Sequence, residues 1–113
     1  MKVNILGTEY KIETHKISED EHMKKNNFMG YCWYDEKLIV IADMSEKEYF
    51  QFDNKDAEMN FKNKVLRHEM IHAMLYESGL STCCEWANNE IMIDWIALQV
   101  PKMIESFKQI DCI

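Results

Sequence analysis

Two histidines and a glutamate at positions 68–72 form the group of residues best suited to chemistry. His68 and His72 are four residues apart, so on a helix their imidazoles lie one turn apart on one face, with Glu69 between them in sequence. Two ring nitrogens placed in this way can bind one metal ion. Because a catalytic zinc site uses three protein ligands and leaves a fourth position open, the spacing predicts two ligands of a zinc site and requires a third.

The surrounding sequence has the periodicity of an amphipathic helix. Apolar residues and the two histidines recur at spacings of three and four over residues 61–76. Gly79 follows, and glycine is the usual residue just after a helix end because it accepts a left-handed conformation. We therefore expect a helix from about Lys55 or Ala57 to Ser78, with its histidines pointing inward.

A carboxylate is the natural third ligand, because no histidine follows His72 in the sequence. Glu77 lies about 140° around the same helix from His72 and should point away from the metal. A second helix is expected after the Gly79 turn. Thr82 and Glu85 have the spacing of a capping box, which would place the start of that helix at Thr82.

Glu90 is the predicted third ligand. It shares one face of the second helix with Trp86, Ile93 and Ala97, and this face is apolar enough to turn inward. A carboxylate on a buried face is costly unless it is paired or bound to a metal. Asp94, one turn later, could instead accept a ring N–H from a metal-bound histidine, and the sequence leaves open an exchange of the two roles.

Residues 65–101 resemble the ImmA/IrrE family of small, often phage-associated metallopeptidases. Asp94 stands where that family usually has asparagine, and Ile96 stands where it usually has phenylalanine. The interval between the second histidine and the downstream glutamate is shorter than is typical of the family. The matching residues are those of the His-Glu-x-x-His motif and three on the following helix: His68, Glu69, His72, Glu90, Ala97 and Pro101.

The resemblance implies an intracellular, zinc-dependent metallopeptidase with a minimal zincin-like fold. Zn²⁺ held by His68, His72 and Glu90 would lower the pKa of its bound water and polarise the scissile carbonyl. Glu69 would act as the general base and then as the acid towards the leaving amine. The substrate would be a protein or peptide, by family analogy a repressor. Four tyrosines are candidates for stabilising the oxyanion: Tyr31, Tyr34, Tyr49 and Tyr76.

The upstream half predicts a small antiparallel sheet of three or four strands. Residues 2–14 have the pattern of a hairpin, and two more strands are expected at residues 31–34 and 37–42. In zincins the edge strand near the metal helix often pairs with extended substrate, and residues 38–42 are the segment to which we assign that role, although we favour a buried strand as the description of their side chains. Pro101 should end or kink the second long helix, and a last short helix is expected at residues 103–110. The whole chain, residues 1–113, is expected to form one α+β domain.

Composition narrows the setting. A formal net charge of −7 argues against nonspecific nucleic-acid binding, which needs a basic surface. No apolar run is long enough to cross a membrane, and the first ten residues lack the features of a signal peptide, so neither a nucleic-acid nor a membrane partner is expected and a cytoplasmic location is favoured. The sequence does not indicate an oligomeric state.

Two other interpretations remain open at this level. His68 and His72 could be core histidines, with Glu69 exposed and Glu90 paired to one of them. Alternatively, the chain could be a catalytically weak or inactive zincin-fold protein that acts as a phage or mobile-element regulator through protein contact. A closed four-ligand site would favour the regulator, and a fourth position open to water would favour the peptidase.

Overall fold

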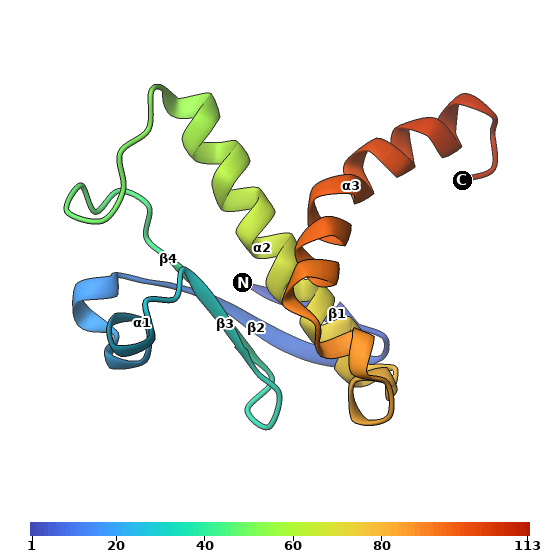
Figure 1. Ribbon diagram of the computed structural model, residues 1–113, viewed down its shortest axis with the longest axis horizontal. Helices are drawn as coiled ribbons and strands as arrows, with labels where there is room; N and C mark the ends of the chain where they lie inside the picture. The colour runs from blue at the N-terminus through green and yellow to red at the C-terminus, as the bar shows by residue number, and fades with distance from the viewer.

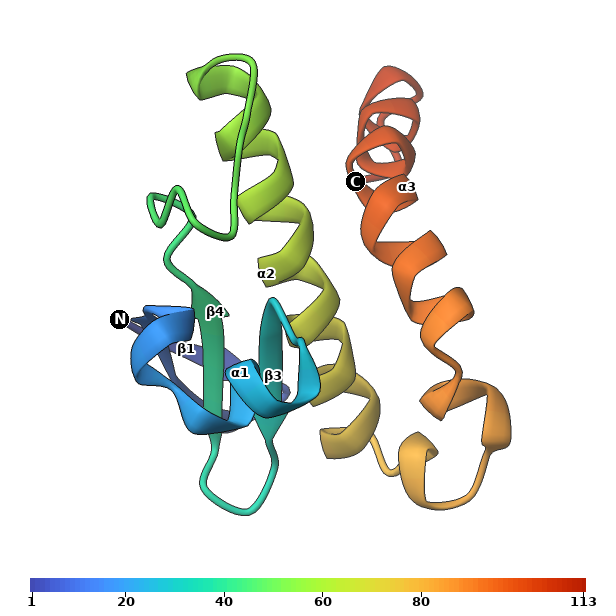
Figure 2. The ribbon, with the colours of Figure 1, turned by 60° about the vertical axis from the view of Figure 1, so that its left-hand side comes forward.

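The computed structural model describes residues 1–113 and confirms the predicted α+β architecture. Helix α2 lies between the sheet and helix α3 (Figure 1, Figure 2). None of its helices combines the length and apolar character that crossing a membrane requires. The main elements are four strands and three α-helices: β1 (Lys2–Ile5), β2 (Thr8–His15), α1 (Glu21–Asn26), β3 (Gly30–Trp33), β4 (Leu38–Ala42), α2 (Lys55–Glu77) and α3 (Glu90–Gln109).

The sheet is mixed, whereas a wholly antiparallel sheet was predicted. Its strand order is β1-β2-β4-β3, and β2 pairs with β4 in parallel while the other two pairs are antiparallel. The chain reaches the far edge first as β3 and returns as β4 between β3 and β2. Four of the five residues of β4 are buried, as expected for a continuous apolar run in a central strand. The assignment of Leu38–Ala42 to the edge is therefore wrong, whereas the description of these residues as a buried strand is confirmed, and β3 is the edge strand.

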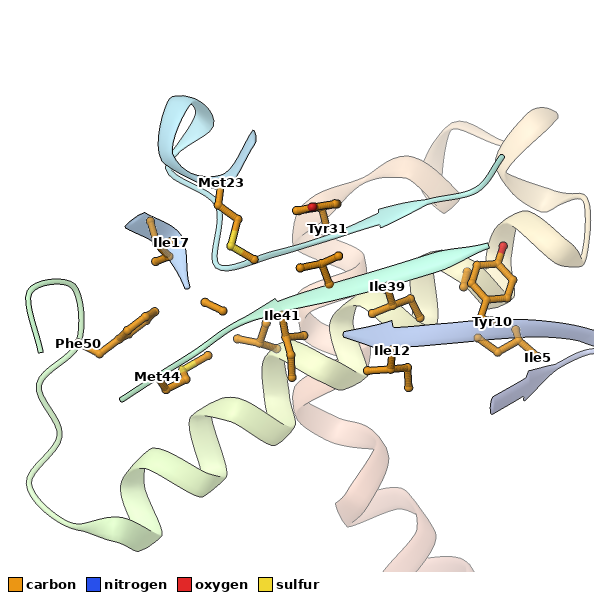
Figure 3. Close-up of a cluster of buried hydrophobic side chains, with 14 residues drawn as sticks. Ile5, Tyr10, Ile12, Ile17, Met23, Tyr31, Ile39, Ile41, Met44 and Phe50 are labelled. Carbon is orange, nitrogen blue, oxygen red and sulfur yellow. The ribbon is translucent and has the colours of Figure 1, made fainter. Parts of the chain in front are cut away.

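The core lies where α2 packs on the sheet, and Figure 3 shows its side chains gathered along β2, β3 and β4. Tyr10, Ile39 and Ala73 are fully buried there. On α2, the residues that face the sheet are Val65, Glu69 and Ala73, spaced four apart. The face that packs on the sheet is thus the one that carries Glu69.

The predicted limits of α2, the helix that carries His68 and His72, are confirmed. The side chain of Asn54 accepts the Ala57 amide and caps its start. Gly79 has a left-handed φ of 86° just after its end. Glu77 points away from the histidines, as predicted. Its carboxylate accepts hydrogen bonds from three groups near the sheet, the hydroxyls of Thr8 and Tyr10 and the Lys37 ammonium, at 2.7 to 2.8 Å.

The start of α3 differs from the prediction. The Thr82 hydroxyl donates to the Gly79 carbonyl, and two short 3-10 turns occupy residues 80–82 and 85–88. The helix begins only at Glu90, where the Asn89 side chain accepts the Met92 amide. The capping-box interpretation of Thr82 and Glu85 is therefore wrong, because the local turn uses the threonine hydroxyl and an asparagine caps the helix.

Pro101 lies inside α3, which continues to Gln109, so the separate helix predicted for residues 103–110 is wrong. Figure 1 shows that the helix changes direction near its middle, in agreement with the predicted kink. A proline leaves the carbonyl four residues before it without its helical donor. That carbonyl belongs to Ala97, and it accepts the Arg67 Nε–H at 2.7 Å. The broken helical bond thus becomes a contact between α3 and α2.

A histidine and an aspartate join the end of β2 to α1. His15 Nδ1 lies 2.7 Å from Asp20 Oδ2, which also accepts the Tyr31 hydroxyl at 2.8 Å. The hydrogen bond to Asp20 raises the pKa of His15, against the effect of burial. Burial opposes the charge of Asp20, but hydrogen bonds from His15, the Met23 amide and Tyr31 outweigh it, so the pKa of Asp20 is lowered.

We expect His15→Gln to destabilise the fold in a pH-dependent way. A raised histidine pKa contributes stability that is fully present below the unfolded value, about 6.5, and is lost as the pH rises through the folded value. The Asp20 contribution is lost only on acidification through its own lowered pKa. The loss should thus be about 1 kcal/mol between roughly pH 5 and 6 and smaller above roughly pH 8. Urea unfolding of both proteins at these values measures it, and equal losses at both would contradict it.

Candidate metal centre

Three predicted ligand residues lie together where the start of α3 meets α2. His68 Nε2 is 2.9 Å from Glu90 Oε2, and His72 Nε2 is 2.9 Å from Glu90 Oε1. One ligand atom from each of the three residues can be chosen so that all lie within 4.8 Å of one another. Two imidazole nitrogens and a carboxylate oxygen are a donor set that zinc accepts. The group can therefore hold a metal ion.

The remaining ring nitrogens of the two histidines have partners of their own. Asp94 Oδ1 lies 3.4 Å from His68 Nδ1, and the Tyr34 hydroxyl lies 3.5 Å from His72 Nδ1, a long contact. A metal-binding histidine usually donates its other N–H to such a group, which fixes its tautomer and orientation. With both Nε2 atoms facing Glu90, this geometry favours Glu90 as the third ligand and Asp94 as the outer partner of His68.

The prediction that Glu90 lies on a buried helix face is wrong, although Glu90 does lie at the site. The side chain of Glu90 is 67% exposed, and so it does not lie on a buried face. Trp86 is exposed as well, whereas Ile93 and Ala97 are buried as predicted. Glu90 meets the histidines because it is the first residue of α3, where the chain comes back alongside α2 after the 3-10 turns.

Glu69 is buried, with 8% of its surface exposed, which contradicts the interpretation that it is a solvated residue on a packing helix. No protein group donates a hydrogen bond to the Glu69 carboxylate. Glu69 is one of the residues that line a pocket on this side of α2. Burial, and after it the charge of Glu90, raises the pKa of Glu69 to about 8. The Glu69 oxygens are not among the buried polar atoms that lack a partner, so the carboxylate opens onto the pocket beside the candidate ligands, where water can solvate it.

The surroundings of His72 favour its neutral imidazole form. Burial lowers its pKa, and although the charge of Glu90 opposes this effect, the balance remains below the ordinary value. Neutral imidazole is the form that binds metal ions. The rings of His68 and His72 are 4.9 Å apart between centroids and meet edge to face, so the two are not stacked on each other.

A pocket of about 770 Å³ opens in front of these residues. It lies between β3 and α2, is bounded by α1, and includes Glu90 and Asp94 at the start of α3. Its walls therefore combine the candidate metal ligands with the residues of the edge strand. The residues of β3 were not predicted to belong to the site, since a strand order cannot be read from local sequence patterns.

Of the four candidate tyrosines, Tyr34 is the one placed to act in this pocket. It lines the pocket, and its ring stacks on Tyr76 at 4.2 Å between centroids. Burial raises the pKa of Tyr34 to about 12, so that its hydroxyl keeps its proton at neutral pH. The Tyr31 hydroxyl is already used as a donor to Asp20, and Tyr49 and Tyr76 do not line the pocket.

Gly30 was missed in the sequence, although it allows α2 to approach the edge strand. A Cβ atom at this position would lie 3.1 Å from the Val40 carbonyl oxygen and from Val65 Cγ1, and 3.2 Å from Glu69 Cγ. The glycine is needed for space, since its φ lies outside the left-handed region. The close approach fixes the position of the Glu69 stem against β3.

We expect Gly30→Ala to lower the free energy of unfolding by about 1–3 kcal/mol, the usual cost of an extra methyl group in a packed interior. The carbonyl of Val40 belongs to a central strand and cannot easily move, so the strain should fall on Val65 and Glu69. Urea denaturation measures the loss. A change within about 0.5 kcal/mol, as for an ordinary surface substitution, would show that α2 is free to shift.

Comparisons with known proteins add no assignment: no family model matches the chain, and no curated protein or solved structure matches it. The resemblance to the ImmA/IrrE family thus rests on the motifs alone. The structure itself defines an α+β protein with a candidate site of two histidines and one glutamate. This donor set is compatible with zinc but not specific to it, since iron and other divalent metals also bind two histidines and a carboxylate.

Proposed function

We propose that the protein is a cytoplasmic zinc metallopeptidase of the ImmA/IrrE type that cleaves a protein or peptide substrate. One observation carries the proposal: Glu69, a largely buried residue whose carboxylate opens onto the pocket, lies beside two histidines whose Nε2 atoms face Glu90. A packing role for the histidines alone does not require a buried acid at this position. The repressor as substrate follows from the family resemblance and has no separate support in the site.

Each residue of the site has a role in this reaction. His68, His72 and Glu90 would hold zinc, which when bound lowers the pKa of water and polarises a carbonyl group. Glu69 accepts a proton from the attacking water and passes it to the leaving amine. Tyr34, whose hydroxyl remains protonated, donates to the oxygen on which charge develops.

The free edge of β3 supports a peptide as the substrate. Only one side of β3 is paired, to β4, and its residues also line the pocket that contains Glu69. An extended segment can add to such an edge by backbone hydrogen bonds, which hold it without reading its sequence. The role that was wrongly assigned to residues 38–42 thus passes to Gly30–Trp33.

A second candidate function is a catalytically weak or inactive regulator that acts through protein contact. It is favoured by the outer face of α3, where Ile91, Trp95 and Leu98 are exposed at 81%, 51% and 48%. Large apolar side chains gathered on one face are typical of interaction surfaces. This face is separate from the buried face of α3 that packs on α2, so both functions could use the same fold.

Metal content and cleavage test the proposal. We expect purified protein, dialysed without chelator, to contain about one zinc ion per chain by elemental analysis, since catalytic zinc sites of this type hold one ion. It should cleave an unfolded protein such as reduced casein, and a chelator should stop the cleavage until zinc is restored. Failure to bind added zinc would overturn the proposal. Stoichiometric zinc without cleavage would favour the regulator.

A further inference from the structure

The pocket has a second end, away from the candidate ligands, that is formed by aromatic side chains. His22 lies at its centre: its ring centroid is 4.7 Å from that of Tyr31 and 5.4 Å from those of Phe28 and Trp33. The rings of Tyr31 and Trp33 are 5.0 Å apart. These residues come from α1, the loop after it and β3, and all four line the same pocket as Glu69.

The aromatic cluster is held in place from behind. Asp20 accepts the Tyr31 hydroxyl and, with its other oxygen, caps α1 at the Met23 amide. Met23 is fully buried and anchors α1 to the core. The Asn26 side chain donates to the His22 carbonyl at 2.9 Å. The wall is therefore largely preformed, as ligand pockets usually are.

Three large apolar side chains are left exposed around this end of the pocket. Phe28, Met29 and Trp33 are 42%, 47% and 40% exposed. Single exposed apolar residues are common on protein surfaces, but a group of them lining one cavity is typical of a ligand site. Tyr31 and Trp33 alternate along β3 with Gly30, whose Cβ would face Val65 and Glu69 of α2, so the aromatic end lies on the face of β3 turned away from α2.

Charge is confined to the other end of the pocket. Its charged lining residues are Lys64, Glu69, Glu90 and Asp94, which all belong to α2 or α3. The residues from α1 and β3 contribute no carboxylate and no ammonium group. The only basic group at the aromatic end is the imidazole of His22. An acidic group entering there would lose water and meet no lysine or arginine, whereas a bulky uncharged side chain would lose only unfavourable contact with water.

We propose that the aromatic end, with Phe28 and Trp33 as its walls, is a specificity subsite for a bulky apolar side chain of the peptide, phenylalanine fitting best. The inference rests on the proposed function, because it assigns the subsite to a side chain of the peptide held beside the metal centre. It adds a substrate class to that function: segments with an aromatic or large aliphatic residue next to the scissile bond. Aromatic rings meeting edge to face would add to the burial of apolar area.

Peptide binding tests the subsite separately from catalysis. The probes are pentapeptides with blocked termini, acetyl-Gly-Gly-X-Gly-Gly-amide, with phenylalanine or alanine at X as uncharged probes and aspartate at X as a negatively charged one. They are titrated by NMR into Glu69→Gln protein with zinc and again with chelator. Glu69→Gln prevents hydrolysis during the titration. We expect the phenylalanine peptide to bind about tenfold more tightly than the alanine peptide in both conditions, and the aspartate peptide to bind least.

Phe28→Ala and Trp33→Ala, each added to Glu69→Gln, should reduce this preference to about threefold or less. Phe107→Ala is the matched control, because Phe107 is 43% exposed but lies outside the pocket, and it should leave the preference unchanged. Far-ultraviolet circular dichroism confirms that each variant is folded. A preference that survives both wall substitutions would overturn the assignment to Phe28 and Trp33.

The outcomes distinguish failure of the subsite from failure of the proposed function. A protein that binds zinc and cleaves casein, yet binds the phenylalanine and alanine peptides equally, would overturn the subsite and leave the metallopeptidase intact. A protein that binds no zinc but keeps the phenylalanine preference, lost in Phe28→Ala, would support the subsite and remove the peptidase. Folded protein that binds none of the peptides would overturn the subsite.

Discussion

Glu90→Ala is expected to lower the affinity for zinc by more than about 100-fold, because even the outer partners of metal ligands commonly contribute 10- to 100-fold. The carboxylate of Glu90 faces the Nε2 atoms of both histidines at 2.9 Å, so its removal leaves two ligands where a stable site needs three. Competition between the protein and a chromophoric zinc chelator near neutral pH measures the change.

Asp94→Asn should have the smaller effect, about 10-fold, if Asp94 only orients His68. Asparagine is also the usual residue at this position in the ImmA/IrrE family, which residues 65–101 resemble. Glu105→Ala is the matched control, since Glu105 is an exposed glutamate farther along α3, and it should bind zinc as the wild type does. A larger loss in Asp94→Asn than in Glu90→Ala would exchange the two roles. Wild-type affinity in both variants would show that the site does not use α3.

Predictions that depend on residues close in sequence were the most accurate. The limits of α2 were predictable because the helical period, the glycine stop and the capping residues all lie within one short segment. The same local pattern places His68 and His72 on one face and turns Glu77 away. Glu90 was predicted from an apolar helix face that the structure does not bear out, and its distance from the histidines depends on how the next helix returns.

Long-range arrangement was predicted less well. The strands were located in the sequence, but the insertion of β4 between β2 and β3 depends on which strand buries its apolar residues on both faces. Leu38–Ala42 was a continuous apolar run, and that feature, read as a sign of central position, would have indicated the correct order. The start of α3 was misplaced because both Thr82 and Asn89 are acceptable caps, and only the packed loop decides between them.

The roles of Gly30 and Tyr34 depend on contacts with residues distant in the sequence, and no local sequence pattern predicted them. Gly30 is one of three glycines, and nothing nearby indicates that Glu69 Cγ would lie 3.2 Å from a Cβ atom there. Tyr34 could not be separated from three other tyrosines until its hydroxyl was placed near His72 Nδ1. The burial of Glu69, on which the proposed function depends, likewise follows from the approach of α2 to the edge strand.

Glu69→Gln is expected to lower kcat by about 10²- to 10⁴-fold while zinc content stays near that of the wild type, because the residue transfers protons and does not bind the metal. Glutamine has nearly the same shape and no charge, so the packing against Gly30 should be kept. Because burial disfavours the charged form at this position, the variant should be at least as stable as the wild type. Initial rates of casein cleavage with saturating zinc measure the effect on turnover.

Glu58→Gln is the matched control on the same helix. Its carboxylate is 3.2 Å from the Lys55 ammonium and outside the pocket, so cleavage should be unaffected. Loss of zinc together with activity in Glu69→Gln would mean that Glu69 is itself a ligand, which would close the site and favour the regulator. Retention of full activity would remove Glu69 from the mechanism. Only loss of turnover with zinc retained and Glu58→Gln unaffected agrees with a buried general base beside an open metal site.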